Sequence, residues 1–223
     1  LNKYRYDFVT ADFVNVGGRP VTTHLIAEGE YKSTIKEAYY NKEWNVTAWN
    51  KLCNLDFLRR NNIVFKEGII HEDILWTFFL ANLANSMYAI QEKTYIYNNR
   101  DVSIMGSMTL LQSKDSKLVI YSEINSYLFN RGLNDRCDVS YIWRIKYEMF
   151  NEIRGWDYKK SKKYILALKQ NTKVNPIWAW NLNLLPFKNL IKYLYLILPD
   201  SIACIYYKML NNCSKVLSSL RLE

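Results

Sequence analysis

Three adjacent residues, His71, Glu72 and Asp73, are the part of the sequence best suited to do chemistry. They stand between an apolar pair, Ile69-Ile70, and a run with apolar residues at helical spacing, so they are predicted to open a helix. Acids at a helix start are expected on structural grounds alone, because they complement unpaired N–H groups and the positive end of the helix dipole. A carboxylate at the mouth of a cleft could instead take a proton from an attacking hydroxyl group. This segment alone leaves both interpretations open.

The two acids cannot aim at one reacting atom, because successive residues of a helix point about 100° apart. One of them would act on a substrate while the other holds the loop. His71 stands beside them and could approach a metal, although a lone histidine next to acids is more often a simple hydrogen-bonded residue.

The elements that must position these acids are predicted from hydrophobic periodicity and turn residues. Before residue 107 they are a strand over 6–16, a helix over 33–40 capped by Ser33, a helix over 46–62, a short strand over 63–65, a helix over 72–86, a strand over 88–97 and a polar loop over 98–106. After it they are helices over 108–131, 138–155 and 159–170. The pattern predicts an α/β domain at 1–107 and an all-helical region at 108–223.

The composition is that of a globular protein with a packed core, since 49% of residues are apolar and 23% are charged. The four cysteines show no CxxC spacing and the chain has only two histidines, which argues against a structural zinc site. Buried free thiols in a reducing compartment fit this usage.

The positive charge is confined to one end of the chain. Residues 1–158 hold 19 basic and 19 acidic side chains, whereas 159–223 hold 11 basic and 2 acidic ones. A cationic segment on a neutral body predicts an anionic partner, either lipid headgroups or nucleic acid. No nucleic-acid-binding signature is present, so nucleic acid is not expected.

The same segment suits a membrane surface. None of its apolar runs reaches the roughly 18–20 residues that a spanning helix needs. Short apolar stretches with interspersed Lys, Tyr and Trp are typical of helices that lie in the headgroup region. The interpretation is that 159–223 docks on a membrane; the alternative is a helical subdomain with a solvated basic face.

Four short motifs in order carry a resemblance to a known family. They are WNKL at 49–52, IxFxEG at 63–68, HED at 71–73 and YxYNxRxxS at 95–103. In this order they resemble the bacterial family-2 glycosyltransferases, which build capsule, O-antigen and exopolysaccharide chains. The resemblance covers roughly 6–107. It implies the C-terminal half of a GT-A fold, a doubly wound, Rossmann-like α/β sheet that binds a nucleotide-sugar and a divalent metal.

The resemblance also implies roles for single residues. Asp73 would be the base of an inverting displacement at the anomeric carbon, and Glu72 would position the acceptor or the loop. The remaining substrate-binding residues that it implies are Trp49, Lys51, His71, Trp76, Arg100 and Ser103. For Arg100 a bidentate phosphate contact is physically reasonable, and a solvated loop arginine is the alternative.

No DxD motif occurs in the sequence, although the family coordinates its metal through one. The chain is therefore expected to begin after the donor-binding half. The complete enzyme would use Mn²⁺ or Mg²⁺, and no metal site is expected in this chain alone. We expect the chain by itself to have no transferase activity, and its half-sheet to favour aggregation or a homodimer.

The function that these expectations describe is inverting transfer of a sugar from a nucleotide-sugar donor to a saccharide or lipid-linked acceptor in surface-polysaccharide synthesis. The expected location is cytoplasmic, peripheral on the inner face of the cell membrane. The alternative is a non-catalytic module that docks on the membrane or serves as a scaffold.

Overall fold

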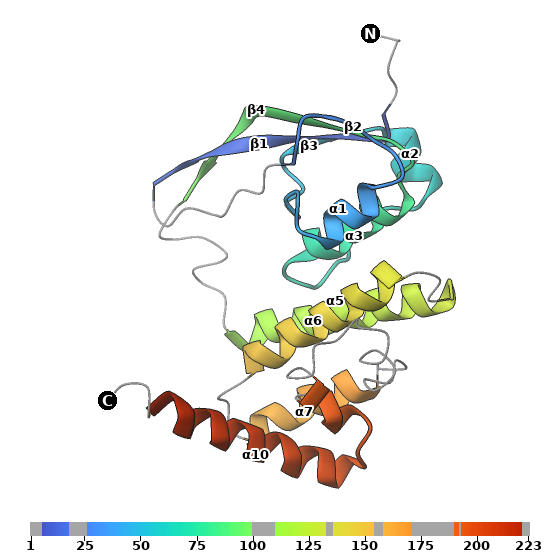
Figure 1. The fold of residues 1–223 in the computed structure, drawn as a ribbon. Coiled ribbons are helices and arrows are strands. Elements are labelled where there is room, and N and C mark those ends of the chain that lie inside the picture. The colour runs from blue at the N-terminus through green and yellow to red at the C-terminus, as the bar shows by residue number, and fades with distance from the viewer. Residues whose placement is uncertain are drawn as a thin grey trace. The chain divides into compact units, whose positions relative to one another are not determined.

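Figure 1 shows the computed structural model of the chain, which describes residues 6–17, 26–99, 110–132, 136–153, 158–170, 190–191 and 193–219. The chain divides into two compact units, Leu1–Ser116 and Lys117–Glu223. The division falls inside helix α5 (Leu110–Asn130). The first unit is mixed α/β and the second is helical, as the sequence predicts.

The first unit is built on a four-stranded sheet with the strand order β2-β4-β1-β3. The strands are β1 (Phe8–Val16), β2 (Gly29–Tyr31), β3 (Lys51–Cys53) and β4 (Met87–Asn98). β1 and β4 pair in parallel, whereas β2 and β3 pair antiparallel at the two edges. The sheet is therefore mixed, with its parallel pair in the centre.

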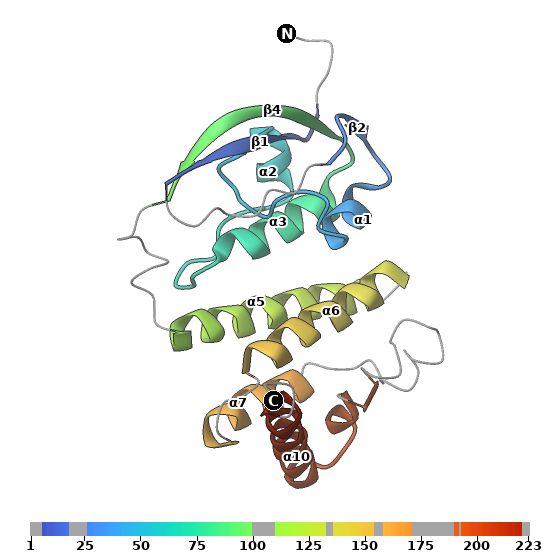
Figure 2. The same ribbon diagram turned by 60° about the vertical axis from the view of Figure 1, so that its left-hand side comes forward.

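The central pair is irregular at one point. The register between β1 and β4 shifts on both sides of Asp12, which lies opposite Lys93. An extra residue in one strand bends the pair and increases its twist. In both views β1 and β4 are visibly curved (Figures 1 and 2).

Three helices lie on one face of the sheet (Figure 2). They are α1 (Ile35–Tyr40), α2 (Leu55–Arg60) and α3 (Glu72–Leu83). The core between them and the sheet includes the buried side chains Phe8, Trp44, Phe57, Phe78, Leu80 and Met87. α3 carries apolar residues on nearly every side and is mostly buried, so packing rather than amphipathicity stabilises it.

The predicted helix over 46–62 is wrong. The chain instead forms β3, which pairs with β1, and then α2. The Asn54 side chain accepts hydrogen bonds from the N–H groups of Asp56 (2.9 Å) and Phe57 (3.3 Å) and so begins the helix at Leu55.

Two smaller expectations are also wrong. No strand forms at 63–65. The Ile63 N–H donates to the Leu58 carbonyl (2.9 Å), so the chain at Ile63 wraps around the end of α2. Ser33 does not cap α1, whose N-cap residue is Thr34 without a side-chain hydrogen bond. The other elements predicted within the described residues are present, and no end is shifted by more than three residues.

The second unit contains most of α5 together with α6 (Arg136–Ile153), α7 (Tyr158–Gln170), the 3-10 turn η1 (Leu194–Leu196) and α10 (Asp200–Ser219). The Tyr207 hydroxyl donates to the Ile153 carbonyl (3.0 Å) and joins α10 to α6. Lys169 and Asp200 form an ion pair between α7 and α10. Over the described residues, no helix is both long and apolar enough to cross a membrane.

Candidate active site

The start of α3 is held by its neighbours. His71 adopts the left-handed conformation (φ 64°) directly before the helix, and its carbonyl accepts the Ile74 N–H (3.1 Å). The beginning of α5 supports the same turn through two serine hydroxyls. Ser113 Oγ lies 2.9 Å from His71 Nε2, and Ser116 Oγ accepts the Ile70 N–H (3.0 Å). The residues directly before the acids are therefore held by two hydrogen bonds to α5.

Asp73 is half-buried at this helix start, and its carboxyl group is electrostatically perturbed. Burial, followed by the neighbouring Glu72, raises the pKa of Asp73 to about 6, although the Ile74 N–H and the Lys51 ammonium pull it down. A carboxyl group with a pKa close to neutrality can accept a proton and release it at physiological pH. This is the property that a general base needs.

The Lys51 ammonium lies in a buried cage of oxygen atoms. Its Nζ donates to the carbonyls of Asn45 (2.7 Å) and Thr47 and to Asn50 Oδ1 (2.9 Å). The ammonium also lies 5.2 Å from the centre of the Trp44 ring. Because an ammonium has three N–H donors, the cage uses all of them. Lys51 thus holds the 44–51 segment rather than presenting a free donor.

The caged ammonium is coupled to the acid. Burial lowers the pKa of Lys51 to about 7, whereas first Cys53 and then Asp73 act in the opposite direction. The segment around the cage is tied to α3, since the Thr77 hydroxyl donates to the Val46 carbonyl (2.6 Å). The carboxyl group and the ammonium therefore form one electrostatic unit, in which each charge shifts the pKa of the other.

Trp49 belongs to an aromatic cluster on the bent part of the sheet. Its ring stacks on those of Tyr95 (4.3 Å between centroids) and Tyr97 (5.2 Å), and Phe13 meets it edge-on (4.7 Å). Trp49 and Tyr97 are half-buried, and Tyr95 is 39% exposed. The cluster joins β1, β4 and the segment before β3.

Connectivity sets the direction of α3 relative to β4. α3 ends at Leu83 and β4 begins at Met87, so the start of α3 lies toward the other end of β4. The aromatic residues Tyr95 and Tyr97 stand near that carboxyl end. Ligands of open α/β sheets bind outside the carboxyl ends of the parallel strands.

The other predicted site residues are placed differently. Trp76 is only 6% exposed and stacks on Phe65 (5.1 Å), which suits a packing role. Glu72 is half-buried beside Asp73. Arg100 and Ser103 lie outside the described residues.

Two further residues were not singled out from the sequence. Asn50 holds β1 at the bulge through two hydrogen bonds. Its side-chain amide donates to the Ala11 carbonyl (2.8 Å), and its main-chain carbonyl accepts the Ala11 N–H (3.1 Å). The neighbouring Asp12 is 4% exposed, and within the described structure its Oδ1 has no hydrogen-bond partner. The sequence signal for Asp12 was its position as an aspartate within a strand rich in Phe and Val.

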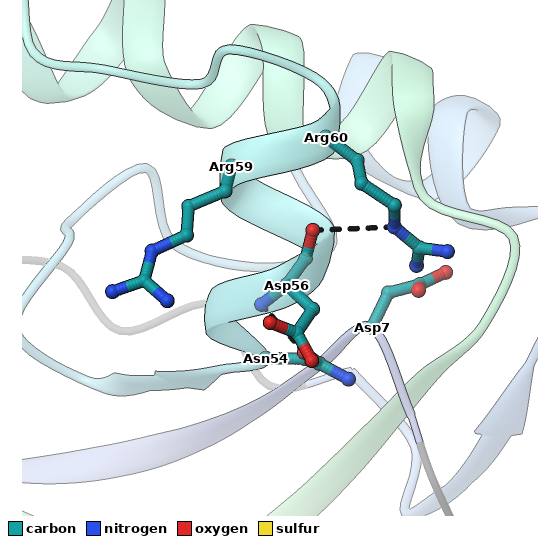
Figure 3. Close-up of a pocket in the computed structure, with 5 residues that line it drawn as sticks. All are labelled: Asp7, Asn54, Asp56, Arg59 and Arg60. Atoms are coloured by element: carbon teal, nitrogen blue, oxygen red, sulfur yellow. Dashed lines mark hydrogen bonds between the residues drawn. The ribbon is translucent and has the colours of Figure 1, made fainter.

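A polar pocket of about 460 Å³ lies elsewhere in the first unit (Figure 3). It is lined by Asp7, Asn54, Asp56, Arg59 and Arg60. The Asp7 carboxylate accepts N–H groups of the turn that follows α3, so the pocket lies about one helix length, roughly 18 Å, from the start of α3. It is separate from the Asp73 site.

Residues that could hold a divalent metal do not gather in the part of the chain that the structure describes. No group of three or more His, Cys, Asp or Glu side chains comes together there. We therefore assign no metal ligands and derive no step through a metal.

The fold is similar to that of the Staphylococcus aureus glycosyltransferase TarS. The crystal structure of TarS 1–349 with UDP-GlcNAc matches with a TM-score of 0.55 and 17% identity, over 94% of this chain and 60% of that one. The structure of TarS 1–349 alone matches with a TM-score of 0.50 and 16% identity, over 94% and 58%. The chain thus spans about 60% of the length of these relatives. No protein-family model and no curated sequence matches the chain.

Proposed function

We propose that the chain is the acceptor-side part of an inverting family-2 glycosyltransferase with a GT-A fold. It would transfer a sugar from a nucleotide-sugar to a saccharide or lipid-linked acceptor in surface-polysaccharide synthesis. The observation that carries this proposal is the Asp73 carboxyl group, half-buried at a helix start with its pKa raised to about 6, within a fold similar to that of a glycosyltransferase.

The proposed chemistry is a single displacement. The ionised Asp73 carboxylate removes the proton of an acceptor hydroxyl group, and the oxygen attacks the anomeric carbon of the donor sugar. The bond from that carbon to the nucleoside diphosphate breaks, and the leaving group keeps the electron pair. Attack opposite the leaving group inverts the anomeric configuration.

The surrounding residues would adjust the pKa of the base and position the substrate. Glu72 raises the pKa of Asp73, and the caged Lys51 charge limits that rise. The stacked Trp49 and Tyr95 rings offer the apolar and polar surface that suits a sugar ring. His71, hydrogen-bonded to Ser113, would hold the turn rather than the substrate.

The donor is proposed to be a nucleotide-sugar, because TarS 1–349 was crystallised with UDP-GlcNAc. The sequence has no DxD motif, so we expect the 223-residue chain to be inactive by itself. Mn²⁺ or Mg²⁺ and the residues that bind it would belong to the complete enzyme. The lack of a DxD motif in the sequence also favours the second candidate, a non-catalytic membrane-docking or scaffold module.

We further propose that the protein works at the inner face of the cell membrane, held there by residues 159–223. The basic excess of this segment, 11 against 2 acidic residues, supports an anionic lipid surface as the partner. A lipid-linked acceptor would be presented at the same surface.

A transfer assay tests the proposal. The chain alone, and the same reading frame with any codons upstream of Leu1, are incubated with UDP-sugars, Mn²⁺ and saccharide acceptors. We expect turnover only from the longer protein, and NMR of the product should report inversion at the anomeric carbon. Retention of configuration would contradict the proposed displacement, and absence of turnover from the longer protein would favour the scaffold function.

A further inference from the structure

Helix α10 in the second unit carries an apolar stripe on its outer face. Ile202, Ile205 and Met209 are 50%, 59% and 61% exposed. Their spacing of three and four residues places them on one side of the helix. Among the described side chains of α10, the opposite side packs inward, with Ala203, Cys204 and Tyr207 almost fully buried. The helix is therefore anchored in its unit by one face and leaves the other unpacked.

The stripe continues beside the helix. The Tyr206 hydroxyl donates to the Ile191 carbonyl (2.7 Å), which holds that segment against α10. Ile191 is itself 41% exposed. Several large apolar side chains gathered on one surface mark an interaction site more often than single exposed ones do.

The net charge of the second unit favours one kind of partner for the stripe. Lys208 is exposed next to Met209, and α7 of the same unit exposes Lys159, Lys162 and Lys163. Residues 159–223 carry 11 basic and 2 acidic side chains. A second copy of this chain would bring two strongly cationic segments together, which like-charge repulsion disfavours. An anionic surface is favoured instead.

We propose that α10 is the docking element of the protein. Ile202, Ile205 and Met209 would enter the headgroup and acyl boundary of an anionic lipid bilayer, while the exposed Lys208 contacts the headgroups and the basic excess of 159–223 attracts the protein to the anionic surface. A helix with an apolar stripe and basic flanks binds in the plane of the interface. This inference rests on the proposed membrane location, but it does not depend on the proposed transfer reaction.

Vesicle flotation tests the inference with the full 223-residue chain. The wild type is mixed with phosphatidylcholine vesicles, with and without phosphatidylglycerol, and compared with Ile205→Ser/Met209→Ser. The matched control is Leu52→Ser/Val64→Ser, which removes two apolar side chains of the first unit that are 77% and 66% exposed. A conservative variant, Ile205→Leu/Met209→Leu, keeps the apolar stripe.

We expect the wild type to float with the anionic vesicles and to dissociate at high salt. The serine variant of α10 should partition at least ~tenfold more weakly, because it removes two large apolar side chains and full burial of each one contributes about tenfold. The control and the leucine variant should bind like the wild type, and circular dichroism should report the same helix content for all four proteins. Equal binding by the two serine variants, or no binding of the wild type to anionic vesicles, would overturn the proposal.

Two further results distinguish lipid docking from sugar transfer and from self-association. Asp73→Asn should float like the wild type, so loss of transfer and loss of docking are distinguishable. If the wild type forms an oligomer that Ile205→Ser/Met209→Ser converts to a monomer, the stripe is an interface between copies, and the lipid assignment is wrong.

Discussion

Replacing Asp73 by asparagine is expected to stabilise the folded chain at pH 8 and to leave its stability nearly unchanged at pH 4. Asparagine keeps the size of the side chain and can still accept the Ile74 N–H, but it removes a half-buried charge. Burial and Glu72 raise the pKa of Asp73 from the ordinary value of 3.8 to about 6. The folded state therefore holds the proton more tightly than the unfolded state does, and ionisation opposes folding.

The sign and the magnitude follow from this shift. The stability that the raised pKa contributes is fully present below about pH 4 and is lost as the pH rises through about 6. A shift of about two pH units corresponds to at most ~3 kcal/mol. Residual solvent contact reduces this value, and the favourable contacts with N–H groups at the helix start are already contained in the net shift. We expect a net gain of ~1–2 kcal/mol for the variant at pH 8.

Urea unfolding followed by circular dichroism at pH 4, 6 and 8 measures this difference. Asp56→Asn is the matched control, because Asp56 is also the second residue of a helix but is exposed. The control should change stability by less than ~0.5 kcal/mol at pH 8. A destabilised Asp73→Asn at pH 8, or a change of the same size at pH 4 and pH 8, would refute the reasoning.

Three other substitutions probe the same structure. Lys51→Met should raise the pKa of Asp73 above about 6, because the Lys51 ammonium of the wild type lowers that pKa. ¹³C NMR titration of the Asp73 carboxyl group measures the change. An unchanged pKa would argue against the coupling. Trp49→Ala should cost ~2 kcal/mol in urea unfolding, since it removes stacking on Tyr95 and Tyr97, whereas an unaffected midpoint would mean that the cluster adds little. Lys146→Met should stabilise the chain by ~1–4 kcal/mol at pH 7, because burial lowers the pKa of Lys146 to about 7, and this gain exceeds the loss of its hydrogen bond to the Leu168 carbonyl (3.2 Å). The gain should shrink toward pH 10, where the unfolded lysine also loses its proton, and a gain that does not depend on pH would contradict the buried-amine account.

The sequence was sufficient to place the acids at a helix start. Apolar residues at helical spacing after Asp73, with acids in the first turn, predicted α3 from residue 72, and the structure begins it there. The long strands of the parallel pair were also predictable, because β1 is rich in Phe and Val and β4 contains the alternating pattern of a strand.

The segment before α3 was not predictable in the same way. Residues 46–62 have apolar side chains at helical spacing, yet Asn54 caps a shorter helix and Lys51 gathers the preceding carbonyls around its ammonium. These contacts depend on closure of the first unit around a buried charge. A lysine in the sequence reads as a surface residue, so neither its cage nor its effect on Asp73 could be inferred from spacing.

The most direct test of the central claim is the pH dependence of kcat/KM for sugar transfer by the reading frame that includes this chain and any codons upstream of Leu1. If Asp73 is the general base, the rate should rise through a pKa near 6 and level off above it. Asp73→Asn should then lower the rate on the order of 10²–10⁴-fold while acceptor binding persists. A profile that is flat across this range, or an Asp73→Asn enzyme that transfers sugar at the wild-type rate, would contradict the assignment.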